Sequence, residues 1–259
     1  MLSVEHGSNQ WNKNIILSII VIILFFSAIL IYLNAKVTTG FDSDMNHSDY
    51  LKKNIASLIK EKKCEKCNLS EAIIKGITVN NVELRHANLY SADLSNIVMK
   101  HGDFEGANLE NATLISANLE RANLIRTTLR QAKLDNAILD RANLEGADLS
   151  FATLNGAHLV STDMIGTRFH NANLMDADLT EANLEGSYFV GANLQHVTLR
   201  YAVLKNANLN DVDFTGADLR YANLLGAQLS HANFTDVQFE GAWWVDGRKC
   251  LPGPTGHCN

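Results

Sequence analysis

The chain has 259 residues, of which 46% are hydrophobic and 19% charged, with a formal net charge of −6. This composition excludes a collagen-like chain and a disordered low-complexity chain. The chain also lacks the overall basic charge that is typical of nucleic-acid-binding proteins, so we expect no nucleic-acid partner. The acidic surplus lies in the middle, where residues 67–241 hold 21 acidic residues against 12 Lys and Arg.

A short N-terminal tail over residues 1–14 precedes a long apolar stretch. The 19 residues from Ile15 to Leu33 include no charged residue. A helix of this length spans about 28 Å, close to the apolar core of a bilayer. The stretch is longer than the apolar region of most signal peptides, and the nearby Leu33–Ala35 is a poor cleavage site. We therefore predict a transmembrane helix over 15–33, with a long cleaved signal peptide as the alternative.

A polar linker over 34–47 leads to a second helical pattern, predicted over 48–63 with Ser48 as its N-cap. Apolar residues recur there with the spacing of one helical face, at Leu51, Ile55, Leu58 and Ile59. The pattern predicts a short amphipathic helix that caps the next domain. Because the segment is rich in lysine, a helix on a membrane surface is the alternative.

A five-residue repeat fills residues 64–242. Every fifth residue from Leu69 to Phe239 is apolar, giving 35 central residues, of which 25 are Leu and 6 are Phe. The residue two places earlier is small, usually Ala, and ten of the 16 glycines lie in the last place of a repeat. A period of five fits neither a helix nor a flat strand. It indicates a chain that turns after each repeat, with four sides to a 20-residue coil and coils stacked in parallel.

The 20-residue register makes a prediction about neighbouring coils. Residues 20 apart should lie one above the other, and three aromatic pairs have this spacing. They are Phe169 with Phe189, Tyr201 with Tyr221, and Phe214 with Phe234.

The repeat A-(D/N)-L-x-x, as in Ala142-Asn143-Leu144, resembles the pentapeptide-repeat family, and its 35 copies cover about two-thirds of the chain. The resemblance implies an all-β solenoid, a right-handed quadrilateral β-helix. The apolar stretch and the helical pattern described above place one transmembrane helix and a capping helix before it. At about 4.8 Å per coil, the rod would be roughly 42 Å long.

Cysteine pairs flank the repeat, with Cys64 and Cys67 before it and Cys250 and Cys258 after it. The rod holds the two pairs too far apart to share one tetrahedral metal. We expect a disulfide within each pair, with reduced structural thiols as the alternative. Disulfides would indicate an oxidising compartment.

The segments around the cysteines also resemble those of secreted or anchored family members. The lead-in has the form K-x-C-x-x-C-x-L, and the predicted C-terminal cap over 243–259 has the form W-x-D-G-x-x-C followed by G-x-C. Pro254 departs from the Ser that is usual in this tail. Trp243 and Trp244 are candidates to plug the last coil, because a solenoid end needs a cap.

The orientation of the predicted membrane helix depends on two opposing signals. Lys13 and Lys36 flank the apolar stretch and nearly balance, while further lysines downstream favour a cytoplasmic domain. The cysteine pairs favour export. We therefore expect a single-pass protein of the bacterial cytoplasmic (inner) membrane, with its repeats in the periplasm or outside the cell.

The sequence offers no catalytic, cofactor-binding or metal-binding pattern. No nucleophile elbow, P-loop or Rossmann fingerprint occurs. Six histidines of the repeat fall in different columns of the 20-residue register: His86, His101, His158, His170, His196 and His231. We therefore expect no enzyme, no cofactor and no metal site.

One corner of the coil gathers residues that protein interfaces favour as anchors. The candidate interaction corner comprises Arg121, Arg141, Arg200, Tyr201, Arg220 and Tyr221, with His101 nearby. An ordinary solvated corner is the alternative.

The sequence as a whole indicates a non-enzymatic membrane-anchored solenoid that serves as a protein-interaction surface or structural spacer. Its partner would be an unidentified protein or a second copy of the chain. The family resemblance also offers an acidic DNA mimic that binds DNA gyrase or topoisomerase. The predicted anchor and the Arg and Lys interleaved among the acids argue against that alternative.

Overall fold

The computed structural model describes residues 47–251 and residue 258. The predicted transmembrane stretch Ile15–Leu33 lies outside these residues. Within 47–251, no helix is long and apolar enough to cross a bilayer. Backbone contacts divide the chain into two units, and the second, Asp49–Asn259, holds nearly all of the described residues.

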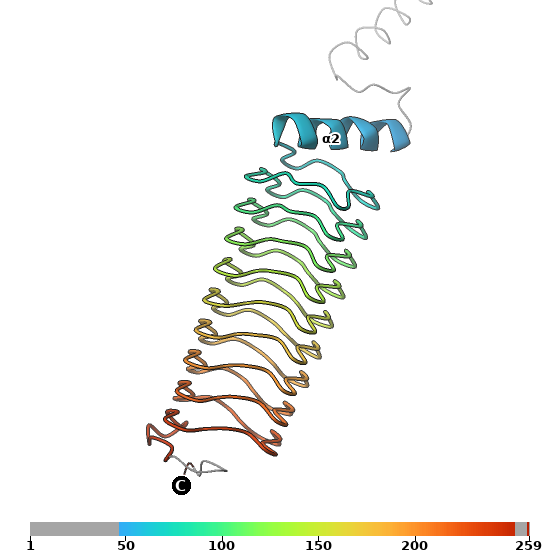
Figure 1. Ribbon diagram of the computed structural model, residues 1–259. Coiled ribbons are helices and arrows are strands. Elements are labelled where there is room, and N and C mark those ends of the chain that lie inside the picture. Colours follow the sequence, from blue (N-terminus) through green and yellow to red (C-terminus); the bar gives the residue numbers. More distant parts are fainter. Residues whose placement is uncertain (1–46, 252–257, 259) are drawn as a thin grey trace, which may run out of the picture. The chain divides into compact units, whose positions relative to one another are not determined.

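Helix α2 spans His47–Glu61 and covers the first coil with one of its sides (Figure 1). Leu58 is fully buried in the core of the coils, and Leu51 and Ile55 pack against the same core. The Asn54 side chain donates a hydrogen bond to the backbone oxygen of Asn68, at 2.8 Å. This bond and the apolar contacts together hold the helix on the coils.

The helix starts one residue earlier and ends two residues earlier than its sequence pattern predicts. Ser48 therefore lies within the first turn and is not the N-cap. Lys62 ends the helix in a left-handed conformation, with φ of 58°, and its N–H donates to the Leu58 oxygen at 3.1 Å. The chain then enters the first coil at Lys63.

The coils are joined by single parallel bridges between residues 20 apart. One bridge occurs every five residues, from Lys63↔Glu83 to Asn223↔Trp243. Each side of a coil is so short that only its middle residue pairs with the next coil, and no longer strand forms among the described residues. Figure 1 shows the coils stacked from α2 to the C-terminal end. The structure confirms the predicted solenoid and its 20-residue register.

Each side of a coil ends in a tight turn that contains a residue with positive φ. Such residues recur every five positions from Lys66 to Gly241, with φ between 53° and 73°. The next N–H donates back to the central residue, as Ala87 does to Leu84 at 3.0 Å. Positive φ at the third residue is the signature of a type II turn, which explains why Gly and Asn gather at the corners.

The central side chains fill the inside of the coils. Leu89, Leu144 and Leu199 are fully buried, as are nearly all central residues between Leu69 and Leu224. The rings of Phe169 and Phe189 stack with centroids 4.5 Å apart, and those of Phe214 and Phe234 with centroids 5.3 Å apart. The 20-residue register predicts both stacks.

Gly102 stands at a small inward position where most coils have Ala. A Cβ there would lie 2.7 Å from Cε2 of Phe104 and 3.0 Å from the backbone oxygen of Met99. Phe104 is the first Phe among the central residues and is fully buried. The space that its larger ring takes is therefore the space that Ala would need at residue 102.

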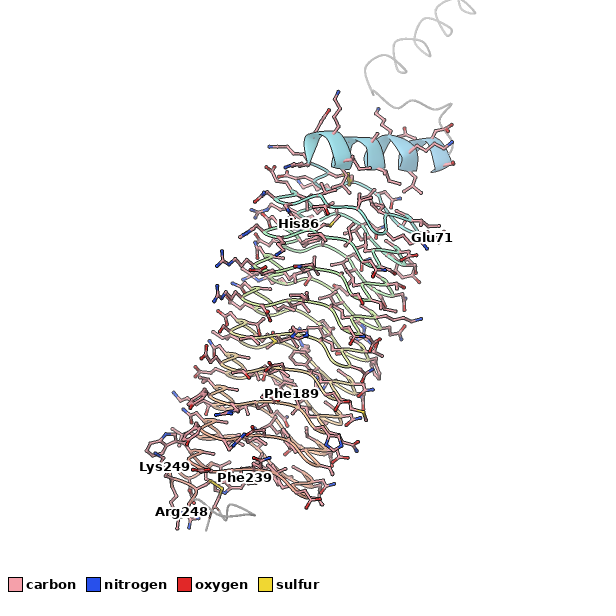
Figure 2. The ribbon with its side chains drawn as sticks, in the orientation of Figure 1. Glu71, His86, Phe189, Phe239, Arg248 and Lys249 are labelled. Carbon is pink, nitrogen blue, oxygen red and sulfur yellow. A yellow bond between two sulfur atoms is a disulfide. The ribbon has the colours of Figure 1, made fainter. Side chains whose placement is uncertain are left out.

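Both ends of the coil stack carry a disulfide. Cys64 is bonded to Cys67 beside α2, and Cys250 is bonded to Cys258 at the other end. Trp244 packs edge-on against Phe234 and Phe239, with ring centroids 5.8 and 5.4 Å away. These rings form an aromatic plug in the last coil, where Figure 2 shows Phe239.

Trp243, which we expected to share in this plug, lies outside it. Its side chain is 48% exposed. The reason is its register: residue 243 bridges to Asn223 as the middle residue of a side, and such residues point outward. The sequence prediction is therefore wrong for Trp243 and agrees with the structure for Trp244.

Candidate interaction surface

The tyrosines of the predicted corner form a stack on the outside of the coils. The rings of Tyr201 and Tyr221 lie 5.0 Å apart between centroids, with an angle of 7° between their planes. Both residues take the positive-φ position of their turns, at 60° and 62°. Tyr201 is 50% exposed and Tyr221 is 39% exposed. The stack thus presents two aromatic edges to solvent at neighbouring levels.

Each tyrosine is preceded by an arginine, and the structure holds both arginines in place. The Arg200 guanidinium lies 5.9 Å from the centroid of the Tyr201 ring, within the range of a cation–π contact. Arg220 donates from Nε and an Nη to the two carboxylate oxygens of Asp218, at 2.8 and 2.6 Å. A guanidinium held at two points loses less conformational freedom when a partner binds.

The contact with Arg220 also sets the protonation of Asp218. Burial by itself would raise the pKa of the Asp218 carboxyl. The hydrogen bonds from the side chain and backbone of Arg220, together with its positive charge, outweigh burial and hold this pKa below its usual value. The same pairing raises the pKa of Arg220. Both groups are therefore charged at neutral pH.

The other two predicted arginines lie in the same column but at a distance from the tyrosines. Arg121 and Arg141 occupy the positive-φ position on neighbouring coils, each at 58°. Ser161 and Glu181 take that position on the next two coils, and the Ser161 hydroxyl donates to the Glu181 carboxylate at 2.9 Å. The structure therefore splits the predicted corner into two groups. We call Arg200, Tyr201, Arg220 and Tyr221 the Tyr/Arg corner.

An additional aromatic and cationic pair lies near the C-terminal end of the coils. The Lys249 ammonium is 5.9 Å from the centroid of the exposed Trp243 ring. Figure 2 shows Lys249 and Arg248 at this end. Trp243 comes two residues after Gly241, which lies under the Tyr221 ring. Sequence reasoning missed this pair, although extending the register from Asn223 by 20 residues places Trp243 on the outside.

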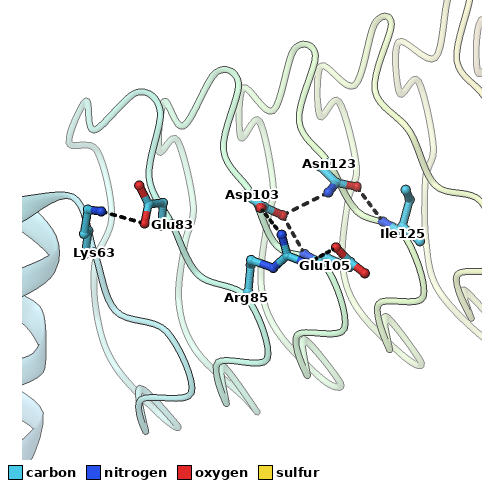
Figure 3. Close-up of polar contacts among 7 residues, drawn as sticks. All are labelled: Lys63, Glu83, Arg85, Asp103, Glu105, Asn123 and Ile125. Carbon is cyan, nitrogen blue, oxygen red and sulfur yellow. Dashed lines mark hydrogen bonds and ion pairs between the residues drawn. The ribbon is translucent and has the colours of Figure 1, made fainter.

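The first coils carry a polar ladder on the side whose column of bridges ends at Trp243 (Figure 3). Lys63 pairs with Glu83 at 3.0 Å, and Arg85 pairs with both Asp103 and Glu105. Asn123 donates to Asp103 at 3.0 Å on the following coil. Such pairs tie neighbouring coils together and place cations among the carboxylates. In these first coils, Lys63 and Arg85 therefore interrupt the acidic surplus.

Metal ligands do not converge in the described part of the chain, where no three His, Cys, Asp or Glu side chains form a possible metal site. Two histidines instead cover a corner of the following coil. The ring of His86 lies over Gly106, and that of His196 lies over Gly216. These rings take part in the packing of the surface.

The solved structures to which the chain is similar include three other repeat proteins. The first is HetL from the cyanobacterium Nostoc sp. strain PCC 7120, a pentapeptide-repeat protein involved in heterocyst differentiation regulation. It is 28% identical over 79% of this chain and 99% of HetL, with a TM-score of 0.37. A pentapeptide-repeat protein of the Arabidopsis thaliana thylakoid lumen is 30% identical over 43% of this chain and 70% of its own, with a TM-score of 0.28. QnrB1, a plasmid-mediated fluoroquinolone resistance protein, is 16% identical over 66% of this chain and 81% of its own, with a TM-score of 0.42.

A comparison with curated proteins finds no match. A family model gives the decisive result. The model for pentapeptide repeats matches eight copies, over residues 63–100, 103–141, 142–180, 177–216 and 213–243. These matches follow the observed coils almost from the first bridge to the last. The chain therefore belongs to the pentapeptide-repeat family.

Proposed function

We propose that this protein is a non-enzymatic, membrane-anchored rod that binds a protein partner through the Tyr/Arg corner. The observation that carries the proposal is the exposed stack of Tyr201 and Tyr221, flanked by arginines. Tyr and Arg, like Trp, are enriched among the anchor residues of protein interfaces. Two stacked rings and a guanidinium held at two points are already ordered, so binding costs less entropy.

The interior of the coils supports a function on the outer surface. Its central residues are closely packed, and the sides contribute small Ala residues between them. A solenoid of this kind offers its outward side chains for binding. Second copies of the chain are possible partners for the same corner, which makes self-association part of the proposal.

The proposed anchor is the uncharged stretch Ile15–Leu33, which has the length of a membrane-spanning helix. The two terminal disulfides favour an oxidising compartment. We therefore place the coils in the periplasm or outside the cell, on a bacterial inner membrane. Fractionation with protease treatment of intact cells tests the anchor and the side. Coils that resist external protease and carry four free thiols would instead be cytoplasmic.

The test of the corner is crosslinking in membranes, with a matched control. Replacing Arg200, Tyr201, Arg220 and Tyr221 by Ala should abolish the crosslinked products of the wild-type chain. The control replaces Arg130 and Phe151, where an Arg lies 5.5 Å from an exposed aromatic ring on another side. If both variants keep the same products, the corner is an ordinary solvated edge. Products that contain two copies of the chain would identify self-association.

A further inference from the structure

The side of α2 that faces away from the coils is lined with lysines. Its exposed residues are Lys52, Lys53, Ala56, Ile59 and Lys60. At 100° per residue, these five fall within an arc of about 120° on the helix surface. The Lys52 side chain is 76% exposed and pairs with Asp49 at 3.6 Å, and Ile59 is 50% exposed. This outer side thus carries three cations and the partly exposed Asp49, together with two exposed apolar residues, Ala56 and Ile59.

The charge of this end differs in sign from that of the coils. Residues 48–66 hold six lysines and three acidic residues, whereas residues 67–241 hold a surplus of acidic residues. Lys62 and Lys66 are exposed beside the end of the helix. The basic α2 end is attracted to a negatively charged surface, whereas the acidic coils are repelled by it. Such a surface would therefore bind the protein at the α2 end alone.

We infer that the outer side of α2 lies on the anionic phospholipid surface of the membrane that holds the anchor. The inference rests on the proposed anchor over Ile15–Leu33. Only 13 residues separate Leu33 from His47, and even fully extended they reach about 45 Å. The tether therefore gives α2 a high local concentration at the membrane. Lysines are attracted to anionic lipid there, and Ile59 can enter the headgroup layer.

This contact sets the direction of the rod. α2 lies across the end of the coil stack, with Leu58 buried against it (Figure 1). When the outer side of the helix rests on the bilayer, the coils point away from the membrane. The Tyr/Arg corner then stands roughly 40 Å from the lipid, at about 4.8 Å per coil. The helix thus forms the end of the rod that lies on the membrane, and the Tyr/Arg corner lies near the opposite end.

The test is lysine acetylation of the full chain in nanodiscs, read by mass spectrometry. Discs of phosphatidylcholine alone are compared with discs that also contain phosphatidylglycerol. Acetylation of Lys53 and Lys60 should be at least about threefold slower in the anionic discs, and added salt should restore the rate. Lys133 on the coils is the internal control and should react equally in both. Equal rates at Lys53 and Lys60 in the two lipids would overturn the inference.

A paired variant separates a lipid contact from a change in folding. Lys53→Glu with Lys60→Glu should remove the protection of Lys52, whereas Lys133→Glu should leave it. If Lys53 and Lys60 are protected from acetylation in native membranes but not in anionic discs, the outer side of α2 contacts an acidic protein. That result would overturn the proposed lipid contact. A chain that does not enter discs at all would overturn the proposed anchor and, with it, this inference. A chain that enters but shows no protection overturns the inference alone.

Discussion

The ring of Tyr221 lies over Gly241, with its Cδ1 2.6 Å from the place that a Cβ on residue 241 would take. The Tyr201 ring stacks on Tyr221 from the preceding coil. The three residues therefore form one column. Because Gly241 has no side chain, the Tyr221 ring can occupy the space where a Cβ would lie. The geometry of the Tyr/Arg corner depends on this glycine.

Gly241→Ala should displace the Tyr221 ring and open its stack with Tyr201. Gly166→Ala is the matched control, because its φ of 63° resembles the 70° of Gly241 but no atom lies within 4 Å of the new Cβ. Both substitutions should cost about 1 kcal/mol of stability for the left-handed backbone. Partner crosslinking through the corner should fall only for Gly241→Ala. Equal crosslinking by both variants would show that the stack is not needed for binding.

Gly102→Ala should destabilise the protein although Ala is the usual residue at that place of the repeat. The new methyl would meet the Phe104 ring and the Met99 oxygen, and overpacking of this kind costs about 1–3 kcal/mol. Phe104→Leu makes room, so the double variant should recover much of the loss. Thermal unfolding of the two single variants and the double variant measures the coupling. Additive losses would contradict the steric explanation.

Leu144→Asp should cost several kcal/mol, because it places a carboxylate in the fully buried interior of a coil. Glu145→Lys, one residue later on the outside, should change stability by no more than about 0.5 kcal/mol. Chemical unfolding of the two variants provides the comparison. Similar small losses from both would be inconsistent with a packed solenoid interior.

Acid should weaken the support of the Tyr/Arg corner through Asp218. The pKa of this carboxyl is lowered in the folded protein, so its stabilising contribution is present above the unfolded value of about 4 and is lost as the pH falls through the folded pKa. The unfolding temperature should therefore fall on acidification below about pH 4, and Asp218→Asn should reduce that dependence. Asp176→Asn is the control, since its carboxylate has no hydrogen bond or ion pair to the described residues. The same pH dependence in both variants would show that Asp218 contributes little.

The register of the coils could be predicted from the sequence because inward residues repeat in phase over the whole domain. The stacks of Phe169 on Phe189 and of Tyr201 on Tyr221 follow directly from that register. The same register, read one step further, would have placed Trp243 outside. Two adjacent tryptophans cannot share one role in the plug, because neighbouring residues of a side point in opposite directions.

The contacts of the corner side chains could not be predicted in this way. Tyr221 lies over the glycine of the following coil, and His86 does the same at Gly106. This direction is set by side-chain torsions and by the space that each glycine leaves, which the spacing of residues does not encode. The bidentate contact of Arg220 with Asp218 likewise depends on torsions and on the local geometry of one turn.

Residues of neighbouring coils pair only when they are 20 positions apart. The number of residues between two positions therefore sets both their separation along the axis of the coils and the side on which each one lies. Removing 20 residues between α2 and Tyr201 would bring that tyrosine about 4.8 Å closer to the helix and leave it on the same side. Removing five would carry it, with everything downstream, a quarter turn around the axis. Gain or loss of a single repeat therefore acts mainly as a rotation, and only changes in multiples of four keep the Tyr/Arg corner on the same side of the coils relative to α2.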